Sequence, residues 1–561
     1  MTSSVQRDIA RLRQLPRKLA VSPEEERMIR ENFEKTGRLR PAQVEMLVEA
    51  MREGALVSGA SVGVGKTLVT ACLPAVLGHE ASDSMLIAPA SLLEKTVKEY
   101  EEYKEHFDID PPARMLSYAS ISRVAGFREL TDNPPGLIIF DEAHRIGFRS
   151  SRARRLSAII EKNSIRCCAL SGTLDRQTYD LQAYIFALCL GMDSPLPVSG
   201  KGIYQLGLAL NDPKDFPMRK QPWMHSKTAR KMVEGIVGVL PPRAFRTEGR
   251  RRLASFIRLS PGVYYPDGGS ADVPIHIKPM DVLRKPNRLV AEVLENLEER
   301  WRLPDGQEII TAAHMADLRK QLRLGFYMEH VWPGGRIDHE WMEARKDWAG
   351  LARSTINAGS RYTSEGELLT AIQESNYGSY PLRRAAENWL MVKNRPGPKS
   401  EVRWLDKSIL RKVAEYAQDE YEAGRPVLVW VHHTAPLDLV DSFGLKNVRS
   451  VWGGDVIPDG PDPPSLFLSI GANREGKNLQ GGFADNKGWA YNLILDYQPT
   501  PYVHEQMLGR THRSGQTRPV YVIYNVSPPF DRSFETLVRK TKVLADKKGD
   551  QKLLLGLDDL I

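Results

Sequence analysis

The stretch LVSGASVGVGKTLVT, residues 56–70, places the strongest constraint on how this chain can fold. A short apolar segment leads into a glycine-rich loop, and Gly65-Lys66-Thr67 then opens a run that suits a helix. Gly63 and Gly65 allow the backbone to turn its N–H groups toward phosphate oxygens, and the helix N-terminus adds partial positive charge. This layout predicts that Lys66 reaches the β- and γ-phosphates of a nucleotide and that the Thr67 hydroxyl binds Mg²⁺.

The loop departs from the general phosphate-binding pattern at one position. That pattern has glycine six residues before the lysine, where this chain has Ala60 preceded by Gly59. The form A-x-x-G-x-G-K-T resembles the version found in helicase-like motors. The alternative interpretation is a flexible glycine turn that binds nothing.

A second candidate segment, LIIFDEAH at residues 137–144, places two acids after four apolar residues. The apolar run predicts a buried parallel strand, and the acids fall at its carboxyl end, where open α/β sheets carry their chemistry. Asp141 is expected to bind Mg²⁺, and Glu142 to orient or polarise an attacking water. The alternative is a surface Asp-Glu pair.

Near the end of the chain, residues 506–522 read QMLGRTHRSGQTRPVYV. Arg510 and Arg513 stand three residues apart, so both guanidinium groups are predicted on one face of a short helix. Such a pair either faces solvent and surface carboxylates or meets an anion, because arginine offers a rigid fork of donors that matches phosphate.

Together these segments resemble, in order and over about 500 residues, the superfamily-two helicase-like motors, and in particular the Swi/Snf-type DNA translocases. The further segments that carry the resemblance are LRPAQ (39–43), APASLL (88–93), LSGTL (170–174), RPVLVWVHH (425–433), SVWGG (450–454), SIGANREGKNLQ (469–480) and NLILDYQPTPYVHEQMLGRTHRSGQ (492–516).

The resemblance implies ATP and Mg²⁺ as cofactors. The nucleotide-binding residues that it implies are Gln43, which would hold the adenine, and Gly63, Val64, Gly65, Lys66 and Thr67. Arg510 and Arg513 would be arginine fingers that meet the γ-phosphate when two lobes close, a contribution of about 10³–10⁵ in rate in phosphoryl-transfer enzymes. Gln506 would help to align the nucleotide or the lobe contact.

Nucleic-acid contacts are implied at three positions. Ser91 belongs to the segment that touches nucleic acid in the family, and Arg474 and Lys477 either contact a phosphate backbone or face solvent. The chain departs from the family pattern at Leu174, where proline is common, and at Asn473, Arg474 and Lys477, where small or apolar residues are typical. These departures bear on substrate preference more than on ATP hydrolysis.

The implied fold is α/β, with two RecA-like doubly wound parallel-sheet lobes and a helical insertion between them. An N-terminal basic arm or helix is expected over 1–37, the first ATP-binding lobe over 38–195 and a mostly helical insertion and linker over 196–399. The second lobe is expected over 400–530, and a C-terminal brace helix and tail over 531–561.

The overall composition favours a polyanionic partner, since the net charge is +8 and the isoelectric point about 9.1. No apolar run reaches the length of about 20 residues that a membrane span needs, and the N-terminus lacks the apolar core of a secretory signal. The four cysteines lack metal-site spacing and suit a reducing compartment, so we expect a cytoplasmic protein of a bacterium or a phage-infected host.

The function expected from the resemblance is ATP-dependent translocation along double-stranded DNA by a monomeric motor, with possible protein partners for targeting. A strand-separating DNA or RNA helicase is one alternative. A nucleic-acid-binding scaffold with weak ATPase activity is another, although Lys66, Asp141, Glu142 and Arg510 are all present. A small-molecule P-loop kinase would leave the second lobe without a role.

Overall fold

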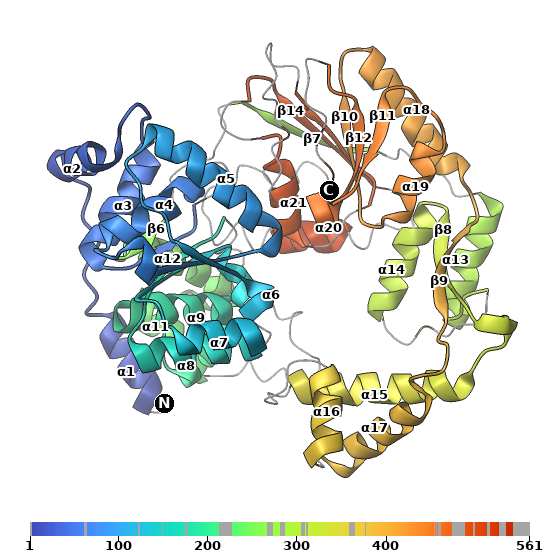
Figure 1. The fold of residues 1–561 in the computed structure, drawn as a ribbon, viewed down its shortest axis with the longest axis horizontal. Coiled ribbons are helices and arrows are strands. Elements are labelled where there is room, and N and C mark those ends of the chain that lie inside the picture. The colour runs from blue at the N-terminus through green and yellow to red at the C-terminus, as the bar shows by residue number, and fades with distance from the viewer. Residues whose placement is uncertain are drawn as a thin grey trace. The chain divides into compact units, whose positions relative to one another are not determined.

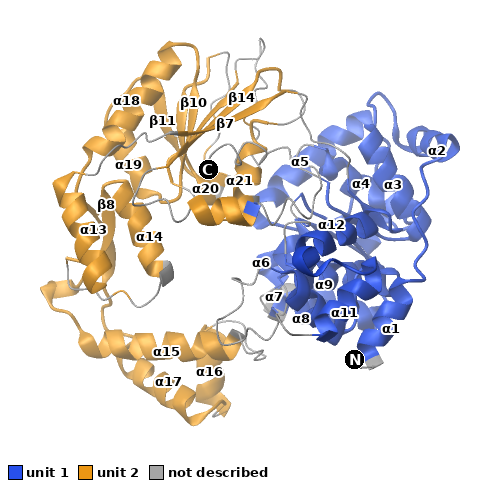
Figure 2. Ribbon diagram, turned by 180° about the vertical axis from the view of Figure 1, so that it is seen from behind, with its two compact units in different colours: residues 1–270, 541–552 blue, residues 271–540, 553–561 orange. Residues whose placement is uncertain are grey.

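The computed structural model contains two compact units, which Figure 2 colours separately: residues up to 270 build the first, and residues 271–540 build the second. The structure describes residues 3–60, 64–121, 124–147, 150–172, 174, 178–211, 227–265, 273–280, 287–304, 309, 312–357, 365–375, 377–453, 455, 457, 462–473, 479, 488–496, 500–512, 516–526 and 534–541.

The first unit is built on a six-stranded, fully parallel sheet in the order β3-β2-β4-β5-β1-β6. Its strands are β1 (Leu56–Ser58), β2 (Ser84–Ala88), β3 (Arg114–Ser117), β4 (Leu137–Asp141), β5 (Arg166–Leu170) and β6 (Val263–Tyr264). Strands β1, β2 and β4 are buried on both faces apart from Asp141, as their continuous apolar sequences predict for a parallel sheet.

Helices cover both faces of this sheet, as Figure 1 shows. One face packs on α2 (Pro23–Phe33), α3 (Pro41–Glu53), α4 (Lys66–Val76) and α5 (Ala90–His106). The other packs on α6 (Tyr118–Ile121), α8 (Ser151–Asn163), α9 (Tyr179–Leu190), α10 (Gly200–Leu210), α11 (Lys227–Val237) and α12 (Phe245–Arg258). Helix α7 (Val124–Asp132) lies next to α6, and α1 (Ser3–Leu12) packs on α10 and α11. Neighbouring residues of β4 alternate between the two apolar clusters, with Ile138 in one and Ile139 in the other.

The second unit repeats the plan with another parallel six-stranded sheet, in the order β11-β12-β10-β13-β14-β7. Its strands are β7 (Ile275–Met280), β10 (Val427–Val431), β11 (Val448–Val451), β12 (Ser465–Ser469), β13 (Tyr491–Ile494) and β14 (Val520–Asn525). Helices α18 (Ser408–Glu422) and α19 (Ala435–Asp441) pack on one face, and α21 (Pro501–Leu508) packs on the other. The short helix α20 (Ile470–Asn473) follows β12, and the helical residues 534–541 add Phe534, Leu537 and Val538 to the α21 side.

The rest of the second unit is mostly helical. It contains α13 (Arg288–Arg300), α14 (Ala312–Arg323), α15 (His339–Asn357), α16 (Glu365–Ser375) and α17 (Tyr380–Val392). An antiparallel pair, β8 (Phe326–Val331) with β9 (Lys399–Trp404), accompanies these helices, and β8 contacts α14. Among the helices that the structure describes, none has the length and apolar character needed to cross a lipid bilayer.

The α/β class with two parallel sheets agrees with the expected fold class. The division of the chain differs from the expected ranges, because strands from the range 196–399 join both sheets: β6 pairs with β1, and β7 pairs with β14. Helices α10 to α12 belong to the first unit for the same reason. The arm at the N-terminus is packed, since the Arg11 guanidinium donates to the carbonyl oxygens of Met192, Ser194 and Leu196.

Candidate functional site

The glycine-rich loop enters α4 through a conformation that requires glycine. Gly65 precedes the helix with φ +85°, in the left-handed region, and its carbonyl oxygen accepts a 3.1 Å hydrogen bond from Nε2 of Gln43. A Cβ atom at Gly65 would collide with that amide. Lys66 is the first residue of α4, and its Nζ donates to the Ala60 carbonyl oxygen at 3.0 Å. The Lys66 side chain thus joins the two ends of the loop.

Gln43 is a structural part of this loop. It is buried, and its Oε1 accepts from the Arg40 backbone N–H at 2.8 Å, so that it caps α3 while its Nε2 holds Gly65. The structure therefore places Gln43 beside the loop, with both ends of its amide bonded to backbone. Val64 packs against the apolar cluster on the α4 side of the sheet, Thr67 lies in the first turn of α4, and Gly63 lies outside the described residues.

The acid pair stands at the carboxyl end of β4. Asp141 is the last residue of the strand, and its Oδ1 accepts the Glu142 backbone N–H at 3.0 Å. Glu142 has φ +53°, a left-handed conformation that costs a non-glycine residue about 1–2 kcal/mol. Strain of this kind concentrates at functional sites, because the surrounding structure must hold it in place. The Tyr118 hydroxyl helps to do so by donating to the Asp141 carbonyl oxygen at 2.8 Å.

The charges of the loop and of the acid pair act on one another. Burial, together with the charge of Glu142, raises the pKa of Asp141 above its usual range, while Lys66 opposes that rise. Burial alone would also raise the pKa of Glu142, but the hydrogen bond and charge of His144, with the charge of Lys66, lower it overall. The Lys66 charge therefore acts on both carboxylates, a charge pattern that a phosphate group with a divalent cation would complete.

Two side chains that the sequence analysis gave no role hold Glu142 in place. The Ser171 hydroxyl, fully buried at the end of β5, donates to Oε2 of Glu142 at 3.0 Å. Nδ1 of His144 lies 2.9 Å from the Ser171 hydroxyl and 3.3 Å from the same carboxylate oxygen. Both residues lie in the segments LIIFDEAH and LSGTL, so their positions were visible, but their contact with Glu142 depends on the pairing of β4 with β5.

The candidate residues of the second unit lie around the end of α21. Gln506 is 1% exposed, and its Oε1 has no hydrogen-bond partner among the described residues. Arg510 is buried as well, but α21 ends at Leu508, so Arg510 lies in the turn after the helix and not on a helical face. Arg513, Arg474 and Lys477 lie outside the described residues. Lys66 and Arg510 belong to different units.

The candidate nucleic-acid contacts are only partly described. Ser91 is exposed in the first turn of α5, beyond the carboxyl end of β2, which neighbours β4. Asn473, one of the departures from the family pattern, is fully buried, and its Nδ2 donates to the carbonyl oxygens of Val451 and Ser469 at 3.2 Å. Asn473 is therefore part of the second unit's packing.

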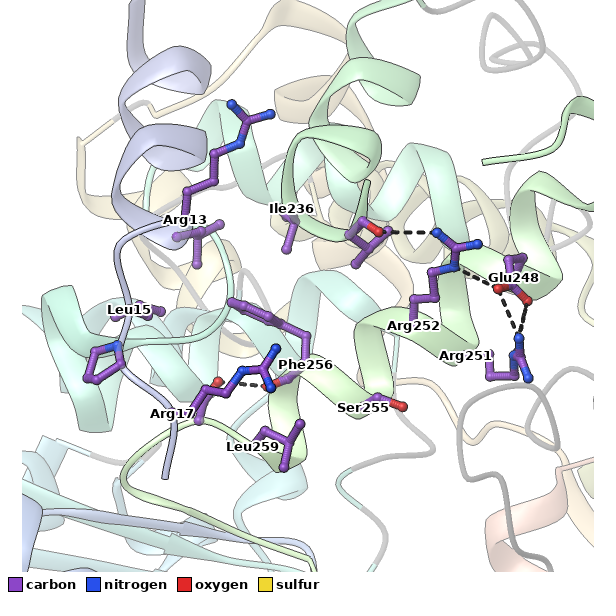
Figure 3. A pocket seen from close by; sticks show the side chains of 14 residues that line it. Arg13, Leu15, Arg17, Ile236, Glu248, Arg251, Arg252, Ser255, Phe256 and Leu259 are labelled. Carbon is purple, nitrogen blue, oxygen red and sulfur yellow. Dashed lines mark hydrogen bonds and ion pairs between the residues drawn. The ribbon is translucent and has the colours of Figure 1, made fainter. Parts of the chain in front are cut away.

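A cavity of about 830 Å³ lies in the first unit between the end of α1 and α12, apart from the residues above (Figure 3). Arg251 and Arg252 line it, and both are paired with Glu248, at 2.8 and 2.6 Å. Both guanidinium groups are therefore engaged with a carboxylate. None of the candidate nucleotide-binding residues lines this cavity.

No protein-family model matches this chain, and no curated protein matches it either. The functional assignment therefore depends on the residues themselves: the loop before α4, the acid pair at the end of β4, and the Lys66 charge that acts on both acids.

Proposed function

We propose that this chain is a nucleic-acid-stimulated ATPase of the helicase-like class, with two RecA-like lobes, that uses ATP hydrolysis to move along double-stranded DNA. The observation that carries the proposal is the placement of Lys66 at the start of α4, after β1, and of Asp141 and Glu142 at the carboxyl end of β4 in the same parallel sheet. A basic side chain at the start of a helix and an acid pair at a strand end of the same sheet support binding of a nucleotide with its cation.

The residues of the first unit have distinct roles in this proposal. The N–H groups at the start of α4 and the Lys66 ammonium would bind the β- and γ-phosphates. The Thr67 hydroxyl and the Asp141 carboxylate offer the oxygen donors that Mg²⁺ prefers, and the raised pKa of Asp141 fits a carboxylate that a cation would stabilise. Bound Mg²⁺ supplies charge stabilisation at the phosphate oxygens.

Glu142 would orient or polarise the attacking water. Its lowered pKa keeps the carboxylate ionised, and the Ser171 hydroxyl fixes the direction of one carboxylate oxygen. In the second unit, Arg510 and Gln506 would complete the site when the lobes close on ATP, and Arg513 would act with them. Closure on ATP and reopening after hydrolysis would then be coupled to a step along the DNA backbone.

Two alternatives use the same ATP site. A strand-separating DNA or RNA helicase would require an element that splits the duplex, and a scaffold with weak ATPase activity would bind nucleic acid without moving. A small-molecule kinase is less well supported, because the second parallel sheet with Gln506 and Arg510 would have no part in it.

The experiment that tests the proposal compares the full chain with Lys66→Ala. We expect the variant to lose ATP turnover and to keep its affinity for DNA, because Lys66 binds phosphates of the nucleotide only. Lys162→Ala, which removes an exposed lysine from α8, is the matched control and should leave both properties unchanged. Normal turnover by Lys66→Ala would refute the site assignment.

A further inference from the structure

Two histidines and two aspartates meet in the second unit at the carboxyl end of its sheet. His432 and His433 follow β10 directly, and Asp496 follows β13, the strand that pairs with β10. Asp317 comes from α14, which belongs to the mostly helical part of this unit. The four side chains come from three separate segments of the chain, and neighbouring parallel strands place their carboxyl ends at one edge.

The distances within this group suit a shared metal ion better than direct hydrogen bonds. Nε2 of His433 lies 3.5 Å from Oδ1 of Asp317 and 4.0 Å from Oδ2 of Asp496, and Nε2 of His432 lies 3.9 Å from Oδ1 of Asp317. Hydrogen bonds between nitrogen and oxygen are about 2.7–3.2 Å long. Donors around a tetrahedral ion with bonds of about 2.1 Å are about 3.4 Å apart. One donor atom from each of Asp317, His432 and His433 lies within 4.8 Å of the others.

Two buried atoms in the group have no hydrogen-bond partner among the described residues: Nε2 of His433 and Oδ2 of Asp496. The Asp496 side chain is only 2% exposed. A buried carboxylate oxygen without a partner is costly. A single proton on His433 could serve one aspartate but not both, whereas a divalent cation would balance the charge of both carboxylates.

Asp317 is held in the orientation that a ligand needs. Nε2 of Gln321, one turn further along α14, donates to Oδ2 of Asp317 at 2.9 Å. Oε1 of Gln321 accepts the Met328 backbone N–H at 2.8 Å, which fixes the direction of the amide. Because Oδ2 is engaged, Oδ1 is the oxygen that faces the histidines. Hydrogen bonds of this kind orient the ligands of protein metal sites.

We propose that Asp317, His432 and His433 bind one divalent transition-metal ion, with Asp496 as the second carboxylate that balances its charge from the sheet side. Two imidazoles and a carboxylate suit Zn²⁺ and its neighbours in the first transition row, whereas Mg²⁺ and Ca²⁺ prefer oxygen donors alone. The ion would fasten α14 to the ends of β10 and β13. None of its residues is among those proposed to bind ATP, and Lys66, Asp141 and Glu142 belong to the first unit.

Metal binding by the full chain, after treatment with a chelator and without nucleotide, tests this assignment. Zn²⁺ is titrated against a chromogenic competitor, and Co²⁺ is followed by its visible absorption. We expect one tightly bound Zn²⁺ per chain, a Co²⁺ spectrum of low coordination number that Zn²⁺ abolishes, and no displacement by millimolar Mg²⁺. Absence of tight Zn²⁺ binding, or displacement by Mg²⁺, would overturn the proposal.

Variants identify the ligands. Asp317→Asn alters a side chain that is 38% exposed, so the fold should tolerate it, and we expect Zn²⁺ affinity to fall by more than about 100-fold. Gln321→Ala, which removes the orienting amide, should weaken binding by about 10- to 100-fold. His339→Gln, at an exposed histidine of α15, is the matched control and should bind as the native chain does. Equal affinity in Asp317→Asn and the native chain, with both melting at the same temperature in Zn²⁺, would overturn the assignment.

Discussion

Replacing Ser171 with alanine tests whether the Glu142 carboxylate takes part in the reaction. The Ser171 hydroxyl is fully buried and donates to Oε2 of Glu142 at 3.0 Å. A hydrogen bond to a charged group contributes about 1.5–3 kcal/mol, which corresponds to a rate factor of about 10 to 150. We therefore expect the kcat of ATP hydrolysis to fall by about that factor, because the carboxylate loses the bond that fixes its direction.

The assay is steady-state ATP hydrolysis by the full chain in the presence of DNA. The KM for ATP should change by less than about twofold, since the loop before α4 keeps its contacts and only the chemical step is affected. Ser157→Ala is the matched control, because it removes a partly buried hydroxyl bonded to Tyr184 at 2.9 Å, away from the acid pair. An unchanged kcat in Ser171→Ala, or an equal loss in Ser157→Ala, would refute the reasoning.

Two further predictions concern the same unit. Gly65→Ala should abolish binding of a fluorescent ATP analogue, because its Cβ would collide with Gln43, whereas Gly78→Ala, at φ +70° with open space around it, should only lower the melting temperature slightly. Burial outweighs the charge of Lys18 and raises the pKa of Glu49. The contribution of Glu49 to the free energy of unfolding is therefore fully present below the unfolded pKa of about 4.3, and it is lost as pH rises through the pKa of the folded state. The melting temperature of Glu49→Gln should therefore rise relative to the native chain across that range, and a constant difference would contradict the burial argument.

The two sheets were predictable in part because their central strands are short apolar runs with polar or glycine-rich ends. The strand before Asp141 is an example, since five residues with four buried apolar side chains leave few other placements. The edge strand β6 was not predictable, because it contains only two residues and exists through pairing with β1, far away in the sequence. Pairing between distant strands depends on the tertiary structure, so the local sequence pattern does not predict it.

The candidate site residues were also predictable only where the local sequence pattern identifies them. The glycine-rich loop before α4 was visible as a candidate because glycine, lysine and threonine stand in a fixed order there. The role of Ser171 was not visible, since it depends on where β5 lies relative to Glu142. The helix expected to carry Arg510 ends earlier, at Leu508, and Gly509 caps it. The proximity of Asp317 to His432 and His433 was likewise not predictable, because it depends on where α14 packs in the second unit.

The measurement that tests the proposed function most directly is ATP turnover by the full chain without nucleic acid and with single-stranded DNA, double-stranded DNA or RNA, each at two salt concentrations. We predict stimulation by duplex DNA that weakens as salt rises, because a translocase grips phosphates and releases counterions. Stimulation by single strands or RNA alone would favour a strand-separating helicase. Absence of turnover under every condition would contradict the proposal that the chain by itself is an ATP-driven motor.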